Sequence, residues 1–79
     1  MSKEATGKMT GEFGRMVVTA VKRAFYDGAS ECGVLLKITD GPHGFLSLTV
    51  PVRFEWTGSP EAVRKMTAAA EDYCRRMSK

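Results

Sequence analysis

Apolar residues recur at two different spacings along this chain, and the spacings predict a helix at each end with strands between them. Between Thr10 and Gly28 they lie three and four positions apart, which places them on one stripe of an α-helix. Thr10 is the expected N-cap, and Asp27-Gly28 is the expected stop. The stripe consists of Phe13, Met16, Val17, Ala20, Val21 and Ala24.

Strict alternation of apolar and polar positions over residues 46–56 is typical of a half-buried β-strand. Pro51 lies on its polar side, and because proline has no backbone N–H, the strand is expected at a sheet edge or at a bulge. A shorter alternating run over residues 32–39 predicts a partner strand. The turn-forming residues 40–44 between the two runs predict an antiparallel hairpin.

Residues 59–61 signal a second helix, with Ser59 as N-cap, Pro60 at the first helical position and Glu61 in the first turn. Three acid-first pairs at i,i+4, including Asp72 with Arg76, support it. Its apolar stripe consists of Val63, Met66, Ala70, Tyr73, Cys74 and Met77.

The element order is therefore α-β-β-α, an α+β fold in which two amphipathic helices cover one face of an antiparallel β-hairpin. Residues 1–9 show no hydrophobic period and are interpreted as a flexible N-terminal tail, so a single domain spans residues 10–79. If Ile38 faces Leu46, the second strand overhangs the first. A two-stranded sheet with open edges is weak, so completion by a partner or by homodimerisation is a hypothesis.

Composition limits the class of protein. The chain has 79 residues, 43% hydrophobic and 27% charged, with a net charge of +3, as in a small folded domain. Its longest apolar run is far shorter than a membrane span, and no signal sequence is visible, so a cytoplasmic protein with no membrane contact is expected. Cys32 and Cys74 fall on apolar positions and are interpreted as buried thiols, with one disulfide as the alternative.

Residues for catalysis, cofactor binding or metal binding do not occur at the spacings that such sites need. His43 is the only histidine and lies in a Gly/Pro loop away from any triad or ligand partner. The carboxylates show no metal-site spacing. The sequence therefore predicts no catalytic, cofactor or metal site, and a protein that is not an enzyme.

Two large apolar residues, Leu35 and Phe45, fall on the polar side of the predicted hairpin, which suggests a docking surface. We expect a small protein-binding module that inhibits or regulates a larger protein or ribonucleoprotein complex by occupying its surface. In size and composition it is similar to phage-encoded inhibitors such as anti-CRISPR proteins. The expected partner-binding residues are Leu35, Lys37, His43, Phe45 and Arg53.

Nucleic-acid binding is the alternative. The solvent face of the first predicted helix carries basic residues that have no acid at i−4, namely Arg15, Lys22 and Arg23.

Residues 41–43 (Gly-Pro-His), Phe45 at the start of a strand and an alanine-rich last helix resemble the double-stranded-RNA-binding domain. That family has an α-β-β-β-α order, and the resemblance implies an RNA contact for His43. Here the loop is one residue shorter, and residues 59–63 stand where the family has a lysine cluster.

Overall fold

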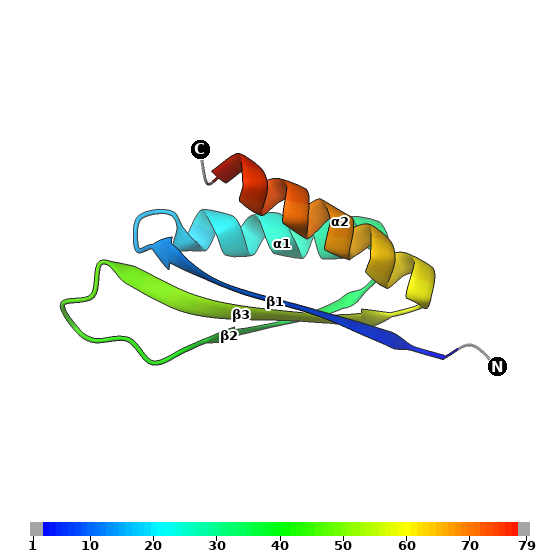
Figure 1. Cartoon of the computed structure of the whole chain (residues 1–79), viewed down its shortest axis with the longest axis horizontal. Coiled ribbons are helices and arrows are strands. Elements are labelled where there is room, and N and C mark those ends of the chain that lie inside the picture. The colour runs from blue at the N-terminus through cyan, green and yellow to red at the C-terminus, as the bar shows by residue number, and fades with distance from the viewer. Residues whose placement is uncertain (1–2, 78–79) are drawn as a thin grey trace.

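Five elements in the order β-α-β-β-α form the described part of the chain, residues 3–77, in this computed structural model (Figure 1). The sheet has the order β1-β3-β2 with both neighbouring pairs antiparallel, and both helices lie on one of its faces. The α+β class is therefore confirmed, with three strands rather than two. The elements are β1 (Ala5–Gly14), α1 (Val18–Cys32), β2 (Leu35–Asp40), β3 (Thr49–Gly58) and α2 (Pro60–Met77).

The N-terminal strand β1 corrects two predictions. Residues 5–9 belong to β1 instead of a tail, and residues 10–14 continue that strand instead of starting a helix; residues 1 and 2 lie outside the described part. From Ala5 to Phe13 its odd positions are half-buried and its even positions exposed, which is a strand period of two. Gly7 and Gly11 hide this period in the sequence, because they stand at positions where apolar side chains are expected.

The presence of glycine at position 7 has a steric explanation. The indole ring of Trp56, the residue paired with Gly7 across the sheet, fills the space that a Cβ atom at position 7 would need. A fully buried tryptophan can therefore cross over β1 only where β1 has no side chain.

The hairpin register also differs from the prediction. Ile38 pairs with Phe54, not with Leu46, so β3 begins only at Thr49 and the loop between the strands covers residues 41–48. Because β1 pairs with β3 over its whole length, β3 is the central strand and has no overhang. The predicted overhang is therefore absent, whereas the open sheet edges that also motivated the dimerisation hypothesis remain at β1 and β2.

Pro51 thus lies in a central strand, contrary to the expectation of an edge or bulge. Its carbonyl oxygen accepts a hydrogen bond from the Gly41 amide at 2.7 Å, so its backbone faces the side of β2. β2 ends at Asp40, and the N–H that proline lacks would point to the position just past that end. The sheet consequently loses no hydrogen bond within its regular part.

Aromatic side chains of β3 connect all the layers. Phe54 and Trp56 are fully buried, and the ring of Phe25 from α1 stacks on Phe54 with centroids 3.9 Å apart. Tyr73 of α2 meets Phe25 edge-on at 5.8 Å. The Trp56 Nε1–H donates to the Thr67 hydroxyl at 3.1 Å, so the one polar atom of the buried ring has a partner.

Helix α1 is shifted along the chain relative to its prediction. It runs from Val18 to Cys32 and ends at Gly33, which has a left-handed φ of 78°. Its buried stripe is Val21, Phe25 and Ala29. Helix α2 agrees with its prediction: the Ser59 hydroxyl accepts the Ala62 N–H at 3.2 Å, and the Asp72–Arg76 ion pair forms at 2.9 Å.

Gly7→Ala is expected to lower the free energy of unfolding by roughly 1–3 kcal/mol, because the new methyl group displaces the Trp56 ring from a close-packed core. Urea denaturation followed by tryptophan fluorescence measures the change. Gly14→Ala is the matched control in the same strand, since its nearest neighbour would be Val17 Cγ2 at an ordinary 3.9 Å. Equal stabilities of the two variants would contradict the explanation given for Gly7.

Candidate functional site

Four large apolar side chains project into solvent at one end of the sheet, and we call this group the apolar tip. Their exposed fractions are 96% for Met16, 90% for Phe45, 86% for Leu46 and 84% for Leu48. They come from the turn between β1 and α1 and from the loop between β2 and β3, which lie side by side at the left end of Figure 1. The Arg15 N–H, which donates to the Leu48 carbonyl at 3.2 Å, joins the two segments.

Polar groups of the loop turn inward and fix its shape. The Arg15 guanidinium donates to the carbonyls of Gly44 at 3.0 Å and Phe45 at 3.2 Å. Gly44 and Ser47 close a turn: the Ser47 N–H donates to the Gly44 carbonyl, and the Gly44 N–H donates to the Ser47 hydroxyl. The His43 ring donates through Nδ1 to the Gly41 carbonyl at 3.1 Å. These bonds hold the backbone while the apolar side chains stay in water.

In the isolated protein the four side chains of the apolar tip stay in water and do not gain the free energy of burial. A large aliphatic or aromatic side chain gains about 1.5–3 kcal/mol when it is fully removed from water. The protein is elongated, with extents of 48 × 25 × 15 Å, and the loop projects beyond the helices (Figure 1). A clustered, protruding apolar surface on an ordered loop is typical of a contact site.

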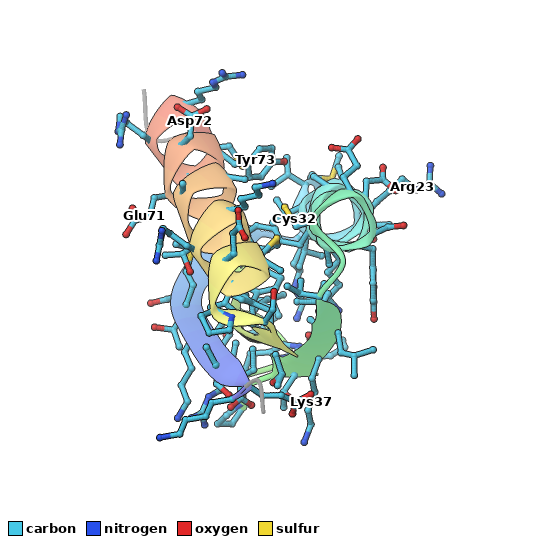
Figure 2. All side chains as sticks on the ribbon, turned by 90° about the vertical axis from the view of Figure 1, so that its right-hand side faces the viewer. Arg23, Cys32, Lys37, Glu71, Asp72 and Tyr73 are labelled. Atoms are coloured by element: carbon cyan, nitrogen blue, oxygen red, sulfur yellow. The ribbon has the colours of Figure 1, made fainter. Side chains whose placement is uncertain are left out.

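The predicted partner-binding residues divide into two groups. His43 lies in the loop, as predicted, and Phe45 also lies there although it was predicted at the start of a strand. Lys37 and Arg53 lie on the open face of the sheet, where Lys37 points away from the helices (Figure 2). Leu35 is on the same face and 77% exposed, but it begins β2 at the end opposite the loop, roughly 17 Å along the strand from Asp40. Leu35 and Phe45 therefore do not form one surface.

The basic residues of the nucleic-acid alternative do not form a stripe. Arg15 precedes α1 and its guanidinium is bound to the loop carbonyls. Lys22 forms an ion pair with Asp40 at 2.9 Å. Arg23 lies on the outer side of α1, away from the sheet (Figure 2). Two of the three cations are thus engaged within the fold.

The two cysteines are free thiols. The Cys74 Sγ lies 3.4 Å from the Met9 Sδ, and burial raises the pKa of the Cys74 thiol above its ordinary value. A raised pKa lowers the fraction of thiolate, the reactive form, at neutral pH.

Potential metal ligands do not gather at one place within residues 3–77, where no group of three His, Cys, Asp or Glu side chains is placed to hold a metal ion. Neither α1 nor α2 has the length and hydropathy required to cross a bilayer. A groove of about 230 Å³ between the helices is lined mainly by apolar side chains, with the Asp72–Arg76 ion pair at its rim.

Comparison with protein-family models, with curated proteins and with solved structures found no match for this chain. The observed β-α-β-β-α order also differs from the α-β-β-β-α order that the resemblance to the double-stranded-RNA-binding domain implies. The similarity of residues 41–45 is therefore confined to the loop.

Sequence reasoning found Phe45 but missed the rest of the apolar tip. Leu46 and Leu48 continue the period of β3, and Met16 continues the spacing of α1, so all three were expected in the core. The only sequence signal for their exposure is the Gly44–Ser47 spacing, which fits a turn.

Arg15→Ala is expected to loosen the loop without unfolding the domain, because it removes two hydrogen bonds from exposed carbonyls. Limited chymotrypsin digestion should then cleave after Phe45, Leu46 or Leu48 faster than in the parent protein. Arg23→Ala is the control and should leave the cleavage rate unchanged. Identical rates for the parent and Arg15→Ala would show that Arg15 does not hold the loop.

Cys74 is expected to react more slowly with iodoacetamide in the folded protein than in urea, because its raised pKa leaves less thiolate at pH 7. The difference should narrow as the pH rises through the folded-state pKa. Peptide mass spectrometry measures the rate at this site, and Cys74→Ala confirms the assignment. Equal rates at neutral pH would contradict the burial effect.

Proposed function

We propose that this protein is a non-enzymatic protein-binding module that anchors itself to a larger partner through the apolar tip. The observation that carries the proposal is the exposure of Met16, Phe45, Leu46 and Leu48 on a loop whose backbone is fixed by Arg15. Fixing the loop before contact reduces the entropy lost on binding, so burial of the four side chains contributes more to affinity.

The tip favours a protein partner with an apolar pocket over a bilayer or a nucleic acid. Membrane-inserting loops gain affinity from cations beside their apolar residues. The two segments that form the tip, residues 14–17 and 41–48, contain Arg15 as their only lysine or arginine, and its guanidinium binds loop carbonyls. Binding to the phosphates of a nucleic acid also needs cations, and these two segments offer none beyond Arg15.

The bound protein regulates or inhibits its partner by covering part of the partner's surface. A protruding anchor seated in a pocket places the rest of the 48 Å long domain over the surface around that pocket. Any other molecule that uses the same surface is then excluded. This mode needs no catalytic group, and the chain acts in proportion to the fraction of partner that it covers.

The double substitution Phe45→Lys/Leu48→Lys is expected to abolish partner binding while leaving the circular dichroism spectrum unchanged, because both side chains are exposed. Affinity purification from host lysate identifies candidate partners. The decisive measurement is the affinity of the purified candidate for the parent and for the double variant, by isothermal titration calorimetry.

Leu35→Lys is the matched control, since it adds the same charge to an exposed apolar position at the other end of the sheet. Retained binding by Leu35→Lys with loss in the double variant supports the tip. Loss in Leu35→Lys alone would move the site to the open sheet face. Sedimentation with anionic vesicles, or a gel shift at low salt, that depends on the tip would replace the protein partner by a membrane or a nucleic acid.

A further inference from the structure

The outer edge of β1 is an unpaired sheet edge within residues 3–77. β1 pairs with β3 on one side only, because the sheet order places it at the end. The Arg15 N–H bond to the Leu48 carbonyl continues the β1–β3 ladder, in which odd residues of β1 exchange hydrogen bonds with β3. The N–H and C=O groups of the even residues therefore point outward: Thr6, Lys8, Thr10 and Glu12.

An apolar hollow adjoins this edge. It has a volume of about 400 Å³ and lies between the end of β1, the turn before α1 and the last turns of α2. Its lining is mainly apolar and consists of Phe13, Val17, Cys74 and Met77 together with Glu12 and Gly14. A strand added beside β1 would have alternate side chains on the helix side of the sheet, and those near Phe13 would reach this hollow.

The position of α2 decides which kind of strand fits. α2 lies above β1 on the helix side of the sheet (Figure 2). Paired strands are about 4.8 Å apart, whereas packed helices need about 8–10 Å between their axes. A second copy of this chain paired through β1 would bring its own α2 too close to this one. A strand without a covering helix meets no such obstacle.

The charges on β1 select the sequence of that strand. On the open face of the sheet β1 presents Lys8 and Glu12, separated by Thr10. Opposite charges across a strand pair stabilise it and like charges destabilise it. An antiparallel segment with a basic residue opposite Glu12 and, four positions later, an acidic residue opposite Lys8 therefore matches the edge.

We propose that β1 accepts an extended segment of another polypeptide as a fourth strand, with an apolar residue of that segment seated in the hollow beside Phe13. Backbone hydrogen bonds to the even residues of β1 supply general affinity, and the hollow with the two charges supplies selectivity. This edge site adds a second contact to the proposed binding module, and it does not depend on the apolar tip.

The probe is a capped synthetic peptide with the sequence Leu-Lys-Val-Thr-Val-Glu-Val-Thr. Its leucine is designed to lie opposite Phe13, its lysine opposite Glu12 and its glutamate opposite Lys8. Titration of the ¹⁵N-labelled full chain is expected to shift the amides of Thr6, Lys8, Thr10 and Glu12 and to slow their exchange with solvent. The amides of the apolar tip should stay unchanged, which separates this result from the proposed function.

Three controls keep the test specific. The same peptide with N-methyl groups on the amides that would face β1 keeps its side chains and should not bind. Exchanging its lysine and glutamate, or replacing its leucine with aspartate, should weaken binding at least several-fold. In the protein, Thr10→Pro removes an outward N–H without touching the β1–β3 ladder, so it should lose binding and keep its fold.

Two results would overturn the proposal. Absence of amide shifts at millimolar peptide would show that the edge does not accept a strand. Light scattering at the twofold mass, 8.7 kDa being that of one chain, with conversion to monomer by Thr10→Pro, would assign the edge to a second copy instead.

Discussion

The structure depends on the burial of two aromatic residues from the central strand, Phe54 and Trp56, beneath both helices. Phe25 of α1 stacks on Phe54. The Thr67 hydroxyl of α2 accepts a hydrogen bond from the Trp56 N–H and donates one to the Val63 carbonyl at 2.8 Å. Each helix is therefore tied to the same strand. In a domain this small, which buries only about 60% of its unfolded surface, such shared anchors determine where every element can lie.

The single layer of helices packed on Phe54 and Trp56 determines which surfaces of the sheet stay exposed to water. Both helices are used to cover one sheet face, so the opposite face, the two edges and the loop end remain in contact with water. These surfaces differ in chemistry. The open face carries mixed charges, the β1 edge carries unpaired backbone groups, and the apolar tip carries side chains that gain free energy only on contact. The proposed binding function uses the apolar tip and the β1 edge.

The site residues show where sequence reasoning succeeds and where it fails. Phe45 was identified because a large apolar residue stood at a polar position of a regular pattern. Leu46 and Leu48 were assigned to the core because they obey that pattern. Their exposure arises from the Ile38–Phe54 register, which lengthens the loop by taking residues 45–48 out of the sheet. The strand register depends on contacts between segments that are distant in sequence, so the local pattern of apolar positions does not predict it.

The sequence by itself determined the α+β class, helix α2 with its Ser59 cap, and the alternating core face of β3, since each rests on local spacing or on a local hydrogen bond. Only the tertiary structure decided that residues 5–14 form a strand, that β3 is central and that Pro51 fits there. The physical reason is the same in each case. Glycine is needed at position 7 because the Trp56 ring fills the space of a Cβ atom, and proline is tolerated at position 51 because β2 ends beside it. Both neighbours are distant in sequence.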